Sequence, residues 1–156
     1  MATLRKVVSS AQPGAERAAL DAALDLGFEA GGWVPKGRRA DDGAVPERYR
    51  VTETPGRDYD QAAEWNIRDT DATLVLTTGR PGSGTVAAVA LAHKMEKPVL
   101  VADMLQPRNL GGILFWLEYG NAKSLNVVGP KESEVPGIRA MAMEFLKGLL
   151  MATKES

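Results

Sequence analysis

Short apolar runs and longer stretches with helical spacing alternate along the chain. The apolar runs predict strands at 4–9, 28–34, 72–78, 99–102 and 125–128. The stretches with helical spacing predict helices at 14–26, 58–70, 84–96, 108–119 and 136–151. Strands that alternate with helices in this way indicate βαβ units and a mostly parallel sheet with helices on both faces. The segment 36–54 has no clear period, so we expect a long ordered loop there.

Two of the predicted helices differ in the number of apolar sides. The last helix has one stripe, which we expect to pack on the sheet. It is formed by Ile138, Met141, Ala142, Phe145, Leu146, Leu149 and Leu150. The helix at 108–119 has two stripes, formed by Leu110, Ile113, Leu114 and Leu117 and by Gly112, Phe115, Trp116 and Tyr119. Such a helix is buried on two sides. Either the domain covers both stripes, or one faces a second subunit of a homo-oligomer.

The composition is that of a soluble globular protein and excludes several kinds of chemistry. The 156 residues are 44% hydrophobic and 25% charged, which predicts a single domain over 1–156. The formal net charge of −1 gives no general attraction to nucleic acid or to an anionic membrane. The chain has no cysteine and one histidine, His93, which we expect to be exposed and without a role. Disulfides and cysteine-rich or histidine-rich metal sites are therefore excluded. We see no secretory or membrane-spanning run and expect a cytoplasmic protein.

The segment 71–97 is the most informative part of the chain. A predicted strand is followed by a turn rich in glycine and then by an alanine-rich helix. This order places unpaired backbone N–H groups and the positive end of a helix beside the carboxyl end of a strand, an arrangement that binds phosphate. We therefore expect the backbone and hydroxyl groups of the turn to bind a phosphorylated small molecule, through Gly82, Ser83, Gly84 and Thr85.

The first predicted strand also leads through a turn into a helix. In open α/β sheets, ligands bind beyond the carboxyl ends of the strands. Gln12 and Gly14 follow the first strand, and we expect them to form the opposite wall of the ligand site. Arg17 lies in the first turn of the helix, where its charge could contribute to that site. The alternative is a surface ion pair between Arg17 and Asp21, one turn later.

Basic residues lie between glycines in the segment 31–43. Unusual backbone angles are rarely maintained in a loop without a purpose, and arginine can bind phosphate through two parallel hydrogen bonds. We expect one or two of Lys36, Arg38 and Arg39 to contact the anion. The alternative is a solvated loop whose charges pair with acidic neighbours, namely Asp41, Asp42 and Glu47.

Two further polar residues are candidates for ligand contact. Asn66 lies on the apolar stripe of the helix at 58–70, and a polar amide on a buried face needs partners. It either hydrogen-bonds a neighbouring loop or reaches the ligand. Asp103 follows the strand at 99–102, where an acid often binds a ribose hydroxyl. Capping of a helix or a loop contact is the alternative for Asp103.

Four segments together carry a family resemblance, namely 12–21, 31–43, 66–74 and 126–133. Their order and spacing resemble the molybdenum carrier family, a molybdenum cofactor carrier-like branch of the SLOG superfamily of Rossmann-like proteins. The Gly31-Gly32-Trp33 segment and the segment that begins at Gly129 are the most specific. The resemblance implies a three-layer α/β/α sandwich. It also implies a protein that holds molybdenum cofactor (molybdopterin) or a nucleotide, with molybdoenzymes as recipients.

The chain departs from the family pattern at the first junction. The family usually has Gly-Gly-Gln-Thr-Gly there, followed by an acid and Arg, whereas this chain has Ser10-Ala11-Gln12-Pro13-Gly14. Pro13 removes an N–H donor, so phosphate binding is either weakened there or moved to the turn at 81–85. That turn resembles a motif of Lonely-guy type phosphoribohydrolases, relatives in the same superfamily. Those enzymes have a catalytic Glu where this chain has Ala88.

Three functions follow as hypotheses. The first is a binding or carrier protein that holds a phosphorylated pterin or a nucleotide, and we favour it because no base–nucleophile pair is evident. The second is an enzyme related to the phosphoribohydrolases that cleaves a nucleotide. Its acid or base would come from Asp41, Asp42, Glu53 or Asp103. The third is a ligand sensor that signals through subunit contacts around Phe115, Trp116 and Tyr119.

Overall fold

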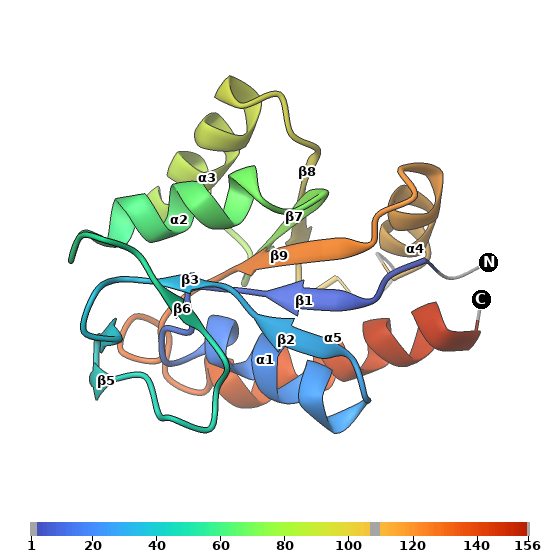
Figure 1. The fold of residues 1–156 in the computed structure, drawn as a ribbon. Helices are drawn as coiled ribbons and strands as arrows, with labels where there is room; N and C mark the ends of the chain where they lie inside the picture. Colours follow the sequence, from blue (N-terminus) through green and yellow to red (C-terminus); the bar gives the residue numbers. More distant parts are fainter. Residues whose placement is uncertain (1–2, 107–109, 156) are drawn as a thin grey trace.

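A five-stranded parallel sheet lies at the centre of the computed structural model, which describes residues 3–106 and 110–155. The strands are β1 (Lys6–Val8), β2 (Glu29–Gly31), β7 (Ala72–Thr77), β8 (Val99–Asp103) and β9 (Ser124–Val128). Their order across the sheet is β2-β1-β9-β7-β8, and every neighbouring pair is parallel (Figure 1). The predicted parallel sheet is confirmed.

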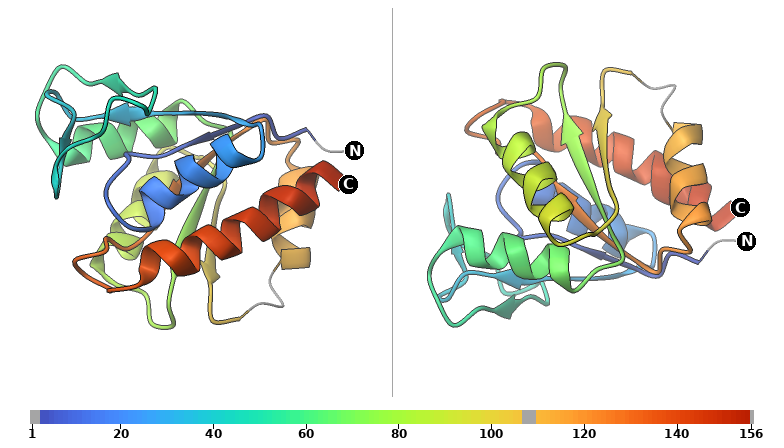
Figure 2. Two further views of the ribbon diagram at one scale, coloured as in Figure 1. Left: turned by 90° about the horizontal axis from the view of Figure 1, so that it is seen from below. Right: turned by 90° about the horizontal axis from the view of Figure 1, so that it is seen from above.

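Helices cover both faces of this sheet (Figure 2). One face is covered by α1 (Ala15–Asp25), α4 (Leu110–Tyr119) and α5 (Ile138–Glu155). The other is covered by α2 (Tyr59–Arg68) and α3 (Ser83–Lys94). The fold is therefore the expected Rossmann-like three-layer sandwich. Residues 108 and 109, which we expected to begin α4, lie outside the described residues.

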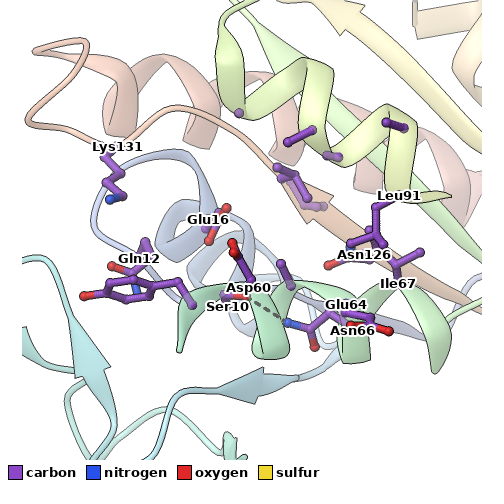
Figure 3. A pocket seen from close by; sticks show the side chains of 18 of the residues that line it. Ser10, Gln12, Glu16, Asp60, Glu64, Asn66, Ile67, Leu91, Asn126 and Lys131 are labelled. Atoms are coloured by element: carbon purple, nitrogen blue, oxygen red, sulfur yellow. Dashed lines mark hydrogen bonds between the residues drawn. The ribbon is translucent and has the colours of Figure 1, made fainter. Parts of the chain in front are cut away.

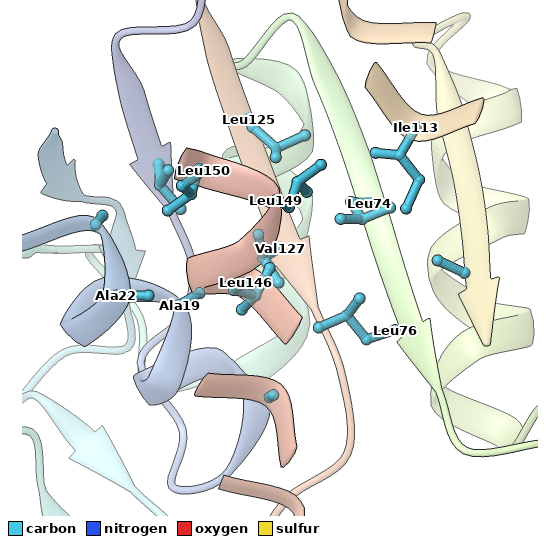
Figure 4. Close-up of a cluster of buried hydrophobic side chains, with 14 of the residues drawn as sticks. Ala19, Ala22, Leu74, Leu76, Ile113, Leu125, Val127, Leu146, Leu149 and Leu150 are labelled. Atoms are coloured by element: carbon cyan, nitrogen blue, oxygen red, sulfur yellow. The ribbon is translucent and has the colours of Figure 1, made fainter. Parts of the chain in front are cut away.

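The main core lies between the sheet and the face that carries α1, α4 and α5 (Figure 4). Side chains alternate along a strand, so β7 sends Leu74 and Leu76 into this core and Thr73 and Val75 toward α2 and α3. The small side chains of α1 allow α5 to pack closely beside it, through residues such as Ala19 and Ala22. The predicted stripe of α5 is buried except at two positions: Met141 is 38% exposed and Phe145 is only partly buried.

The order of the strands becomes the standard Rossmann order when the chain is read from a different starting point. If β9 is counted first and reading continues from the start of the chain, the sheet order is 3-2-1-4-5. The direction of winding then reverses between β9 and β7. In sheets of this type, ligands bind in the crevice beyond the strand ends at that reversal. The topology therefore places the expected ligand site beside the carboxyl ends of β9 and β7.

Four short strands lie between residues 33 and 53, and three of them fall in the segment 36–54 that we expected to be a loop. They are β3 (Trp33–Val34), β4 (Arg39–Ala40), β5 (Gly43–Ala44) and β6 (Thr52–Glu53). β3 pairs with β6 in parallel, and β4 pairs with β5 in antiparallel orientation. A small second core holds this region against the first helix, through Ala11, Leu20, Val34, Ala40, Val45 and Tyr49. Strands of two residues are too short to produce a visible alternation, which explains the missed elements.

Candidate functional site

A cavity of about 610 Å³ lies on the α2 and α3 side of the sheet, at the carboxyl end of β9 (Figure 3). Its walls come from α2, α3, β9 and the segments that follow β1 and β9. The apolar part of the lining includes Ala63, Ile67, Ala87, Ala88 and Leu91. The polar part includes Ser10, Gln12, Glu16, Asn66, Asn126 and Lys131. The position agrees with the crevice that the strand order predicts, and the size suits a nucleotide or a bicyclic ring.

The open N-terminus of α3 lies at this cavity. Gly82 is the N-cap of α3, and no side chain of the described residues caps the helix there. Gly84 lines the cavity, and a Cβ atom on Gly82 or Gly84 would meet nothing within 4 Å. Ser83 is exposed and Thr85 is partly buried. The first N–H groups of a helix have no partner within it, so this end of α3 offers donors to an anion.

Asp103 fixes the chain that leads to α3. Its Oδ1 accepts hydrogen bonds from the N–H groups of Gly79, at 2.8 Å, and Leu105, at 3.0 Å. Gly79 has a φ of +87°, which favours glycine. Asp103 is not among the residues that line the cavity. The structure thus supports the loop contact that was the alternative for Asp103, and a contact with ribose stays a prediction.

Gln12 joins the segment after β1 to the neighbouring segment 36–44. Its Nε2 donates to the carbonyl of Arg39 at 3.2 Å, and its Oε1 accepts from the N–H of Asp41 at 2.9 Å. Gln12 is only 5% exposed and also lines the cavity. Both ends of its amide therefore have protein partners, and its part in ligand binding stays a prediction.

Gly14 makes a close backbone contact between the two segments that follow β1 and β9. Its φ is +119°, and a Cβ atom there would lie 2.6 Å from the carbonyl of Pro130 and from the nitrogen of Glu132. Ala15 N–H donates to the Pro130 carbonyl at 3.1 Å, and Glu132 N–H donates to the Pro13 carbonyl at 2.9 Å. The structure therefore explains this glycine by packing alone.

Arg17 is buried and does not pair with Asp21, so the predicted alternative for Arg17 is wrong. Its guanidinium donates to both carboxylate oxygens of Asp42, at 2.7 and 3.2 Å, and to the carbonyl of Ala11. Asp21 instead accepts from the Tyr49 hydroxyl at 2.7 Å and forms ion pairs with Arg48 and Arg139. Sequence spacing favoured the partner one turn away, whereas the fold supplies one from a distant loop.

The three basic residues of the segment 31–43 do not line the cavity. Arg38 donates to the carbonyls of Val45, Pro46 and Tyr49. Arg39 donates to the carbonyl of Arg57 at 2.8 Å and lies 4.4 Å from the centroid of the Tyr59 ring. Lys36 is exposed, and its side chain has no partner among the described residues.

These contacts show that Arg38 and Arg39 hold their own loop together. None of the three basic residues forms an ion pair with its acidic neighbours within the part of the chain that the structure describes, contrary to the predicted alternative of paired charges. Contact of these residues with an anion stays a prediction. Among the three, the Lys36 side chain is the one that has no partner among the described residues.

Asn66 bonds a neighbouring loop, as one of its two interpretations predicts. Its Oδ1 accepts from Trp33 N–H at 2.7 Å, and its Nδ2 donates to the Trp33 carbonyl and to the Ser10 hydroxyl, both at 3.0 Å. Asn66 is 2% exposed and lines the cavity. Both ends of the Asn66 amide thus have protein partners, and these bonds hold the wall of the cavity in place. A contact with ligand is not needed to account for a polar side chain at this buried position.

Glu16, which was not predicted from the sequence, points from α1 into the cavity (Figure 3). Its Oε1 is out of contact with solvent and has no hydrogen-bond partner among the described residues. Burial raises the pKa of Glu16 to about 7, although the nearby N–H groups of Gln12 and Gly129 and the charge of Lys131 oppose this shift. The sequence signal that could have pointed to Glu16 is an acid in the first turn of a helix that follows a strand of the sheet.

The carboxylates proposed for catalysis are all engaged elsewhere. Asp41 accepts from the Ser133 hydroxyl at 2.8 Å, Asp42 pairs with Arg17, and Glu53 accepts from the Gly37 N–H at 2.6 Å. Together with Asp103, none of them lines the cavity. Within residues 3–106 and 110–155, no cluster of three or more histidine or acidic side chains could hold a metal ion. No helix in these ranges is long and apolar enough to cross a membrane.

A parallel sheet in this rotated order, with a cavity at the point where the winding reverses, defines a protein of the Rossmann-like class. The chain belongs to the circularly permutated YpsA SLOG family (cpYpsA), whose model matches residues 7–150. The family description agrees with the strand order, because counting from β9 restores the standard arrangement. The resemblance to SLOG proteins is confirmed.

A solved structure supports this assignment. The chain is similar to the crystal structure of the "Putative molybdenum carrier protein" from Syntrophus aciditrophicus SB, at 35% sequence identity and a TM-score of 0.91. The match covers 96% of each chain. A search of curated proteins found no match.

Proposed function

We propose that this protein is a carrier that binds a phosphorylated pterin, such as molybdenum cofactor, or a nucleotide. The observation that carries the proposal is the uncapped N-terminus of α3, which opens beside a cavity of about 610 Å³ and contributes Gly84 to its lining. The phosphate would bind the N–H groups of Ser83, Gly84 and Thr85, and the ring would lie between α2 and α3. The name of the similar protein from Syntrophus aciditrophicus supports a carrier role. Molybdoenzymes would then be the recipients of the ligand.

Binding of a nucleotide is expected to stabilise the protein and to depend on the N-terminus of α3. A ligand at about 100 times its dissociation constant adds about 2.7 kcal/mol, which is roughly 5–10 °C in Tm for a chain of this size. Gly84→Asp should abolish this shift, because it adds a negative charge where the phosphate would bind. Thermal melting with GMP, ribose 5-phosphate and inorganic phosphate measures the effect.

Gly84→Ala is the matched control, because it adds a Cβ atom in open space but no charge. The empty Gly84→Asp protein should melt no lower than the wild type, since an acid in the first turn favours a helix. Native mass spectrometry and molybdenum analysis of protein purified from cells identify the bound molecule. A Gly84→Asp protein that still responds to GMP would disprove the phosphate site.

We favour carriage over hydrolysis because no carboxylate stands at the position where the related hydrolases have their catalytic Glu. Ala88, which lines the cavity, stands where those enzymes have their catalytic Glu. The four other candidate acids are bonded elsewhere and do not line the cavity. Release of free base from GMP by the wild-type protein would overturn this preference.

We also propose that copies of this chain associate through the edge of the sheet formed by β8. Apolar side chains are exposed on β8 and on the chain that follows it: Val101, Leu105, Phe115 and Tyr119, the last two at 68% and 82%. The rings of Phe115 and Tyr119 stack with centroids 5.9 Å apart. Exposed apolar side chains near an edge strand are typical of a contact between proteins, and a second copy presents the same side chains in reverse.

The double variant Phe115→Asp/Tyr119→Asp is expected to be monomeric. Light scattering after gel filtration should give about twice the chain mass of 16.7 kDa for the wild type and a single chain mass for the variant. Leu24→Asp is the control, because Leu24 is 46% exposed on α1, which packs on β1 and β2, and β2 is at the opposite edge of the sheet from β8. A wild-type protein that stays monomeric at its highest soluble concentration would refute the contact.

A further inference from the structure

The cavity contains a buried hydrogen-bond acceptor without a donor. Glu16 Oε1 is out of contact with solvent and has no partner among the described residues. Asn126 lines the same cavity, is 2% exposed and donates through its Nδ2 to the Thr73 hydroxyl at 3.3 Å. A ligand that satisfies Glu16 Oε1 must therefore bring a donor.

The environment of Glu16 pairs its carboxyl group only in part, because the N–H groups of Gln12 and Gly129 bond it while Oε1 has no partner among the described residues. No lysine or arginine among the described residues forms an ion pair with it. Lys131 lies close enough to affect its charge, but the Lys131 ammonium is over the Tyr59 ring, 5.4 Å from the centroid. A buried acceptor without a partner lowers stability, and such groups occur mainly where function requires them.

We propose that Glu16 recognises the N–H donors of the ligand ring, and that this ring is a guanine-like or pterin-like heterocycle with an amide N–H next to an amino group. The inference rests on the proposed function and names the class of ring. A carboxylate can accept from two adjacent donors at once. Adenine presents an amino group beside a ring acceptor, so it offers one donor and places a lone pair against the second oxygen.

Recognition by Glu16 makes binding depend on pH. The pKa of Glu16 is about 7 in the empty protein because of burial, and donors that bind the carboxylate lower it. Binding then releases a proton, so the affinity for GMP rises with pH toward 7 and levels off above it, by up to about tenfold per pH unit. The other charged or titratable groups that line this cavity are Lys131 from the segment after β9, Tyr59, Asp60 and Glu64 from α2, and Lys94 from α3. The charge of Glu134, which also follows β9, raises the pKa of Glu16.

The experiment compares GMP, IMP, AMP and ribose 5-phosphate by calorimetry on wild-type and Glu16→Gln protein. IMP is GMP without the amino group, so the pair isolates one donor. We expect GMP to bind to the wild-type protein at least tenfold more tightly than IMP or AMP. In the Glu16→Gln protein, the affinity for GMP should fall to that for AMP. Because the phosphate group itself titrates near pH 6, the expected pH effect is the difference between the two proteins. Glu144→Gln, on the exposed face of α5, is the matched control.

Retained binding of ribose 5-phosphate shows that the Glu16→Gln protein is folded and keeps its phosphate site. The empty variant should also melt above the wild type, because a buried carboxyl group with one unpaired oxygen has been replaced by a neutral amide. If ribose 5-phosphate binds but GMP binds no more tightly, or if Glu16→Gln leaves the GMP affinity and its pH profile unchanged, the inference is overturned and the proposed function stands. If none of the four compounds binds, the proposed function and the inference fail together.

Discussion

Replacement of Gly14 by alanine is expected to lower the free energy of unfolding by about 2–6 kcal/mol. Two effects add. The φ of +119° strains an alanine backbone by about 1–3 kcal/mol. The new Cβ atom would also lie 2.6 Å from the Pro130 carbonyl and the Glu132 nitrogen, and such overpacking costs a further 1–3 kcal/mol or so. Denaturant unfolding measures the loss, which corresponds to a fall in Tm of roughly 5 °C or more.

Two other glycines separate the causes. Gly137 has a φ of +91° but open space around it, so Gly137→Ala should cost only the backbone strain. Gly148 lies inside α5 with open space and ordinary backbone angles, so Gly148→Ala should stabilise the helix by about 0.5–1 kcal/mol. If Gly14→Ala were no less stable than Gly137→Ala, the close backbone contact between the segments after β1 and β9 would not be tight in solution.

Most of the fold was predictable because its elements are long enough to produce a pattern. Every residue of β7 from Ala72 to Thr77 is buried, as its run of apolar and β-branched residues predicts. The period of α5 predicts the buried positions Leu146, Leu149 and Leu150. Met141 is exposed because it lies at the edge of the stripe, where period alone does not decide burial. The two-residue strands of the region 33–53 are held by contacts with distant residues, and no local pattern encodes them.

The candidate site was less predictable because its polar contacts join distant parts of the chain. The sequence places Gln12 and Gly84 near strand ends, and both line the cavity. It does not reveal that Gln12 is already bonded to the segment 36–44. The only signal for Glu16 is an acid in the first turn of a helix, which is a weak one because such acids are common on protein surfaces. In the fold, groups from the segments after β1 and β9, namely Gln12, Gly129 and Lys131, surround that carboxyl group.

Arg17→Ala is expected to destabilise the protein by about 2–4 kcal/mol, because it removes both the partner of Asp42 and the donors to the Ala11 carbonyl. Ala11 is fully buried and has a φ of +57°, so its carbonyl has no easy route to water. Asp42→Asn is the control, since it weakens the ion pair but keeps both hydrogen bonds to Ala11. The Asp42 side chain is 48% exposed, so this change should cost less than about 1 kcal/mol.

The pH dependence of the same pair of variants tests the cause. The hydrogen bond from Arg17 holds the pKa of Asp42 below its usual value. The ion pair therefore contributes stability above about pH 4, and this contribution is lost as the pH falls through the lowered pKa of the folded protein. Unfolding in urea at several pH values should show that the loss in free energy of unfolding caused by Asp42→Asn disappears at acidic pH. Most of the Arg17→Ala cost should persist there, because the Ala11 carbonyl does not titrate. If the loss in stability caused by Arg17→Ala also disappeared at acidic pH, Arg17 would act through its charge alone. It would then not hold the backbone of the β1–α1 segment.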